Sequence, residues 1–157
     1  MSDMTFASWT QPIAGRLEQS KRGVEEVVSQ IPPDNWEKPS GYARWSFKDQ
    51  LSHLGDSHAR VQVVLRAILQ GRDPDFSQFL RIDEINEEDR HKHSASPVEE
   101  LRSAYAERSQ ETLRVVSELT AEHAAFSLGP MTLDQALQGF AMHDMAHLEE
   151  LKKALQG

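Results

Sequence analysis

Four stretches of this chain repeat apolar side chains at the spacing of an amphipathic helix, and this periodicity limits the possible folds more than any other feature. Their stripes run over residues of about 12–30, 47–70, 97–119 and 133–151. No stretch alternates convincingly as a strand. We therefore predict an all-α fold, a four-helix bundle that forms a single domain over residues 1–157.

Capping signals mark the start of three of these helices. The segments 46–49 (SFKD), 96–99 (SPVE) and 132–135 (TLDQ) each place Ser or Thr three residues before Asp, Glu or Gln. This is the pattern of a capping box. The proline that follows the serine in SPVE also suits the first turn of a helix. Gly71 follows the second helix and is expected to stop it.

The connections between the helices are unequal in length. Residues 72–95 link the second and third helices, whereas bundle helices are usually joined by about 2–8 residues. We predict a long crossover that packs on the bundle through its apolar side chains. These are Phe76, Phe79, Leu80, Ile82 and Ile85.

Composition excludes several classes of function. The net charge of −8 argues against nucleic acid or an anionic membrane surface as a partner, because both attract clustered Lys and Arg. Cysteine is absent, so any bound metal would use His, Asp or Glu. No apolar run approaches the ~20 residues of a membrane span. The N-terminal stretch lacks the basic and apolar segments of a secretory signal, so we expect a cytoplasmic protein.

Three histidines occupy the inward flanks of two predicted helices. His143 and His147 are four residues apart, so their imidazoles share one helix face, and His53 lies at the edge of the second helix's apolar stripe. We predict that the three rings meet and hold a metal in the bundle core. Hydrogen-bonded core histidines without a metal are the alternative. His58 points about 140° away from His53 and is not expected to be a ligand.

Two aspartates near these histidines are further candidates. Three neutral imidazoles leave coordination positions open, as catalytic sites do. Asp56, one turn after His53, is a candidate catalytic base or fourth ligand, or else a solvated carboxylate. Asp144 is a candidate acceptor that orients a ligand imidazole, or else a structural acceptor for Trp45, Tyr42 or a backbone donor.

Several motifs resemble the DinB-like superfamily. The pattern W-S-x-x-x-x-L-x-H-L spans residues 45–54, and T-L-x-x-x-L followed by H-D-x-x-H-L spans residues 132–137 and 143–148. The acidic segment IDEINEE followed by SPVEEL, within residues 82–101, is also similar to that family. The resemblance extends from the first helix to the last.

This resemblance implies a bundle of up-down-down-up type, often dimeric, with a divalent metal on three histidines. Carried over by motif, these are His53, His143 and His147. Zinc is favoured over nickel or iron, although imidazole ligands suit all three. Many relatives carry Glu five residues after the first histidine, whereas this chain has His58 there, so the resemblance transfers no role of that glutamate to this chain.

Relatives of this type include thiol-dependent S-transferases, which use bacillithiol, mycothiol or glutathione, and mycothiol-dependent maleylpyruvate isomerases. We therefore expect a metal-dependent enzyme, a thiol S-transferase or a hydrolase, that acts on a small molecule with a low-molecular-weight thiol as a possible cofactor. A non-catalytic bundle that binds metal or a small ligand in a stress response is one alternative. A dimeric scaffold with a relict histidine cluster is the other.

Overall fold

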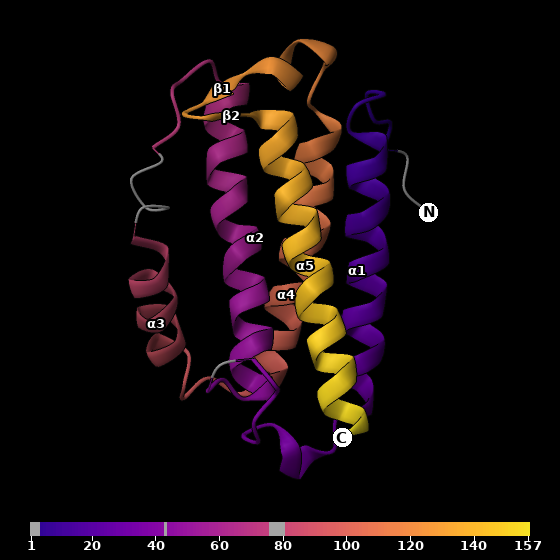
Figure 1. Cartoon of the computed structure of the whole chain (residues 1–157), viewed down its shortest axis with the longest axis vertical. Coiled ribbons are helices and arrows are strands. Elements are labelled where there is room, and N and C mark those ends of the chain that lie inside the picture. The colour runs from indigo at the N-terminus through magenta and orange to yellow at the C-terminus, as the bar shows by residue number, and fades with distance from the viewer. Residues whose placement is uncertain (1–3, 43, 76–80) are drawn as a thin grey trace.

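A computed structural model describes residues 4–42, 44–75 and 81–157 of the chain. The fold is all-α, as predicted. Within the described residues, four long helices lie side by side along the long axis of the molecule, and a shorter helix lies on the outer side of α2 (Figure 1). The long helices are α1 (Gln11–Gln30), α2 (Phe47–Leu69), α4 (Val98–Ser117) and α5 (Leu133–Gln156), and the short one is α3 (Ile82–Lys92).

Short elements complete the connections. A 3-10 turn at Pro33–Asn35 follows α1, and another at Ala121–Ala125 follows α4. Strands β1 (Ser127–Leu128) and β2 (Met131–Thr132) form an antiparallel hairpin directly before α5. Each strand has two residues, which is too short to produce an alternating pattern in the sequence.

Two of the predicted capping boxes are confirmed. The Ser46 hydroxyl accepts from the Asp49 amide, and the Asp49 carboxylate accepts from the Ser46 amide, each at 3.0 Å. Thr132 and Gln135 exchange the equivalent bonds at 3.2 and 3.0 Å. These bonds fix the starts of α2 and α5, the two helices that carry the predicted metal ligands.

The predicted cap of the third long helix is wrong. Helix α4 begins at Val98 with Pro97 at the N-cap position, and no side chain caps it. Ser96 instead closes the turn after α3, because its amide donates to the carbonyl of His93 at 3.0 Å. The serine therefore belongs to the preceding turn and lies one residue too early to act as the cap.

The crossover contains the helix α3, which sequence periodicity did not indicate. Phe76, Phe79 and Leu80 lie outside the described residues, while Ile82 and Ile85 are half-buried. No residue of α3 is fully buried. Polar contacts hold it to α2 and to the segment before α2. Arg60 donates to the Asp89 carboxylate at 2.7 Å and to the Asn86 amide oxygen at 3.0 Å, and the indole of Trp45, which precedes α2, donates to Glu87 at 3.2 Å.

The interior divides into two apolar clusters stacked along the bundle. One lies near the start of α5 and includes Leu17, Leu65 and Leu137, and the other lies near its end and includes Val24, Leu54 and Leu148. Gly23 brings α1 close to α5, since a Cβ atom there would lie 2.5 Å from Leu148 Cδ2. No helix of the described residues is long and apolar enough to cross a membrane.

Candidate metal centre

The structure brings His53, His143 and His147 together between α2 and α5. The Nε2 atom of His143 lies 3.2 Å from that of His53 and 3.2 Å from that of His147. One nitrogen from each ring lies within 4.8 Å of the other two. This spacing fits a shared cation, because imidazole nitrogens bind divalent metals such as zinc at about 2.0–2.1 Å.

A chain of hydrogen bonds fixes the His147 ring. Its Nδ1 atom lies 2.9 Å from the Gln50 side-chain oxygen. The Gln50 amide nitrogen donates to the carbonyl and hydroxyl oxygens of Ser40, at 3.2 and 2.7 Å, which orients the Gln50 oxygen toward the imidazole. Since that oxygen only accepts, Nδ1 carries the proton and the Nε2 lone pair faces the cluster.

Burial keeps the three imidazoles uncharged. Desolvation, with smaller contributions from the charges of His147 and His143, lowers the pKa of His53 from 6.5 to about 2. Desolvation likewise lowers the pKa of His147 to about 4 and lowers that of His143. The rings are thus neutral at pH 7, the state that binds a metal. Their crowded nitrogens need a proton or a cation between them, so this donor set fits a divalent ion.

Aromatic side chains wall one side of the cluster. The centroid of the Trp45 ring lies 4.9 Å from that of His53, and the centroid of Tyr42 lies 5.0 Å from that of His147. Trp45 is itself buried. These residues precede α2 in the sequence, so the segment that leads into this helix covers the histidines and restricts the access of water from that side.

Asp144 does not contact any of the three clustered imidazoles through a hydrogen bond among the described residues. Its carboxylate lies 2.8 Å from Nε2 of His58, and both side chains are about 1 % exposed. The Nδ1 atom of His58 lies 2.9 Å from the Thr112 hydroxyl on α4. The predicted orienting acceptor is therefore part of a separate buried network that ties α5 to α2 and α4. Gln50, which sequence reasoning did not select, is the acceptor for a clustered ring.

Asp56 also lies away from the cluster. Its carboxylate is 3.2 Å from His93 Nε2 and 3.2 Å from Arg108 Nη1, on the side of α2 that faces α4. It lines a cavity of about 250 Å³ that none of the three clustered histidines lines. Desolvation raises the pKa of its carboxyl. Within the described structure, the predicted catalytic base is thus not placed to reach a molecule bound at the histidines.

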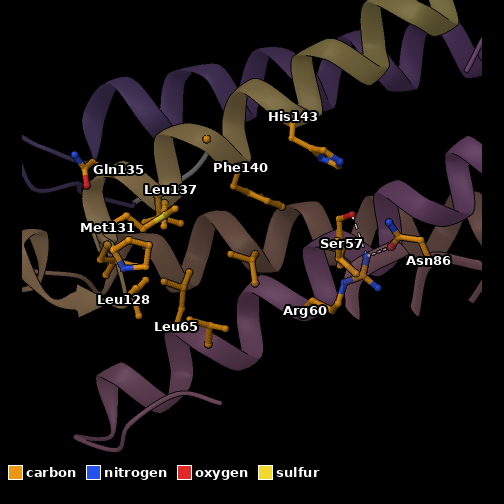
Figure 2. A pocket seen from close by; sticks show the side chains of 18 of the residues that line it. Ser57, Arg60, Leu65, Asn86, Leu128, Met131, Gln135, Leu137, Phe140 and His143 are labelled. Carbon is orange, nitrogen blue, oxygen red and sulfur yellow. Dashed lines mark hydrogen bonds between the residues drawn. The ribbon is translucent and has the colours of Figure 1, made fainter. Parts of the chain in front are cut away.

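A larger cavity of about 920 Å³ opens beside the cluster (Figure 2). His53 and His143 lie in its wall, together with residues of α2, the hairpin and α5. No Asp or Glu is among the described residues that line it. Its position gives a small molecule access to the Nε2 side of the histidine cluster.

The comparisons with known proteins agree with this geometry. The sequence profile of the DinB superfamily matches residues 16–151, a range that includes all three histidines. No curated protein and no solved structure matches the chain significantly. Because the profile covers most of the chain and the fold is all-helical, this protein belongs to the DinB superfamily.

Proposed function

We propose that this protein is a divalent-metal-dependent enzyme built on an up-down-down-up bundle, and that it transfers a low-molecular-weight thiol to a small electrophile. The observation that carries the proposal is the convergence of three neutral imidazole nitrogens, from His53, His143 and His147, beside an open cavity. Zinc is the favoured metal, with nickel and iron as alternatives.

The three imidazoles would hold the metal and leave at least one coordination position free on the cavity side. A divalent cation bound there lowers the pKa of a thiol or water ligand toward neutrality. Gln50 keeps the His147 ring in the tautomer that ligation requires. Trp45 and Tyr42 shield the opposite side of the cluster from solvent.

The cavity wall favours thiol transfer over hydrolysis. Hydrolysis of an ester or amide usually needs a general base that takes a proton from water and returns it to the leaving group. Asp56 and Asp144 are both held by other partners, and no carboxylate lines the described part of the cavity. A thiol that is already ionised needs no such base. Its sulfur forms a bond to the electrophilic carbon, the leaving group departs with the bonding electron pair, and the thiol proton passes to solvent.

Metal content tests the first half of the proposal. Protein purified without a histidine tag should contain about one equivalent of divalent metal per chain, measured by elemental analysis. The His147→Ala variant should lose most of that metal. The exposed His91 provides a matched control, and His91→Ala should keep it. A content below about one tenth of an equivalent in the wild type would favour a scaffold with a relict cluster.

Turnover tests the second half. The wild type should consume a halogenated aromatic electrophile in the presence of bacillithiol, mycothiol or glutathione, at a rate that His147→Ala reduces by at least about 10²-fold and His91→Ala leaves unchanged. Hydrolysis of a nitrophenyl ester without any thiol would instead identify a hydrolase.

A non-catalytic metal-binding protein is the second candidate, and the absence of a carboxylate from the described cavity wall favours it. It predicts a full equivalent of metal with no turnover of either substrate class.

We also propose that the protein acts as a homodimer, as the family resemblance implies. Sedimentation equilibrium should then give twice the chain mass of 17.8 kDa. A mass equal to that of a single chain over the micromolar range would contradict the dimer without affecting the metal site.

A further inference from the structure

The cavity beside the histidines is polar at one end and apolar at the other. Figure 2 shows Ser57, Arg60 and Asn86 near His143, with most of the apolar side chains gathered at the far end, where Gln135 is the one labelled polar residue. That far end is formed by side chains from α2, the hairpin and α5: Leu65, Leu128, Met131 and Leu137, with Phe140 between the two ends. A volume of about 920 Å³ is large for water alone and lies in the range of ligand pockets.

The charges at the polar end favour an anionic group. The Arg60 guanidinium is paired with the Asp89 carboxylate at 2.7 Å, and Asn86 accepts a second bond from it at 3.0 Å. Arg60 therefore adds little net charge. The three imidazoles are neutral ligands, so a divalent cation held by them would keep its full positive charge, with no carboxylate in the described wall to balance it.

Gly139 joins the two ends of the cavity. It lies in the interior of α5, one turn before His143 and on the same face, and it lines the cavity. Glycine destabilises a helix interior by about 1 kcal/mol relative to alanine. No packing contact compensates, because a Cβ atom at this position would meet nothing within 4 Å. Side chains on a helix lean toward the preceding turn, so a larger residue at 139 would extend from the turn before His143 toward Ala136 and fill cavity space between the histidines and the hairpin.

We propose that this cavity binds an amphipathic small molecule, with an anionic head at the histidine cluster and an unbranched apolar body along α5 to the hairpin, and that Gly139 sets the size of the body admitted next to the head. This inference rests on the proposed metal site for the position of the head. The apolar body depends only on the cavity itself, so the two parts can fail separately.

A series of linear carboxylates tests the shape of the ligand. Calorimetric titration of the zinc-loaded protein with butanoate, hexanoate, octanoate and decanoate should show about a fourfold gain in affinity per added methylene, as expected for apolar burial. Decyltrimethylammonium, which has a similar body and the opposite charge, should bind at least about tenfold more weakly than decanoate. Equal affinities along the carboxylate series would overturn the proposal.

Two matched glycine variants test the role of residue 139. Gly15 is also an exposed helix glycine whose Cβ position is open, but it does not line the cavity. Gly139→Leu should weaken decanoate binding by at least about tenfold and change butanoate binding by less than about threefold. Gly15→Leu should change neither. If both variants bind decanoate like the wild type, Gly139 does not determine the size of the ligand.

Titrations after removal of the metal distinguish failure of the apolar site from failure of the proposed metal site. In chelator-treated protein the series from hexanol to decanol, which has no anionic head, should still show the gain per methylene. Loss of carboxylate binding with a retained gain for alcohols would refute the metal-bound head and leave the apolar site intact. A full equivalent of metal with no gain for either series would refute the apolar site alone.

Discussion

Gln50 supplies the nearest acceptor for the His147 ring, because its side-chain oxygen lies 2.9 Å from Nδ1, whereas the Glu150 carboxylate lies 3.6 Å from the same atom. Replacing Gln50 by leucine removes this acceptor for Nδ1–H, so the imidazole can change tautomer or rotate away from the cluster. We expect Gln50→Leu to weaken zinc binding by about 10–100-fold, measured by competition with a chromogenic chelator.

The matched control is Gln62→Leu. Gln62 is a buried glutamine of the same helix, but it donates to Arg108 and Thr112 rather than to a clustered histidine. The Gln62→Leu substitution should therefore lower the free energy of unfolding without changing the zinc affinity. Equal zinc affinities for wild type and Gln50→Leu would show that the glutamine does not position the ring.

We expect the His58–Asp144 pair to contribute to stability rather than to metal binding, because Asp144 bonds to His58 and to none of the three clustered imidazoles within the described structure. Both side chains are buried, and removing one partner leaves the other without its hydrogen bond. Asp144→Ala should lower the free energy of unfolding by about 1–3 kcal/mol in urea titrations. Glu149→Ala, at an exposed position of the same helix, should change it by less than about 0.5 kcal/mol. A loss for Asp144→Ala as small as that of Glu149→Ala would contradict this role.

At the level of single residues, the sequence predicted correctly which side chains approach one another when the helix face of each side chain was enough to decide it. His143 and His147 share a face because of their spacing, and His53 lies at the edge of an apolar stripe, so their approach follows from helical geometry. The partners of Asp56 and Asp144 could not be found in this way. Each carboxylate is held by a residue more than 30 positions away, and such pairs depend on how the helices pack.

At the scale of elements, α2 has a side-chain cap and α4 has none, so we expect different effects of replacing Ser46 and Ser96. Ser46→Ala removes a hydrogen-bonded capping box and should cost about 1 kcal/mol of stability. Ser96→Ala should cost less than about 0.5 kcal/mol, because the Ser96 side chain caps nothing in the structure. Thermal or urea unfolding of both variants provides the measurement. An equal loss for the two would mean that α4 begins one residue earlier than the structure shows.

Helix α3 explains why element prediction from periodicity was incomplete. Its sequence, IDEINEEDRHK, carries only two apolar side chains, so no apolar stripe marks it. Two acidic residues in its first turn and three basic residues in its last turn complement the helix dipole instead. The ion pair of Asp89 with Arg60 then fastens it to α2. The four long helices were predictable because burial of an apolar face determines them, whereas charge placement determines α3.

At the scale of the whole molecule, the cavity is assembled from parts that no sequence window contains. Its wall combines α2, α3, the hairpin and α5, and its position beside the histidines follows from the way the hairpin leads into α5. The candidate metal site, by contrast, depends only on which faces of α2 and α5 are turned toward each other. Sequence reasoning therefore reached the candidate ligands, while the shape of the cavity in front of them required the packed structure.

A metal bound at the cluster should stabilise the entire bundle. It would join α2 to α5 through residues about 90 positions apart, and an ion that binds the folded state and not the unfolded chain stabilises it by about 4 kcal/mol at 1,000 times its Kd. For a domain of this size that corresponds to a rise in Tm of about 8–16 °C. Calorimetry of the wild type with saturating zinc and after chelation should show this difference. His147→Ala should unfold at nearly the same temperature in both conditions, because its incomplete donor set binds the ion weakly. A wild-type Tm that does not change on chelation would mean that the three histidines pack in the core without holding a metal.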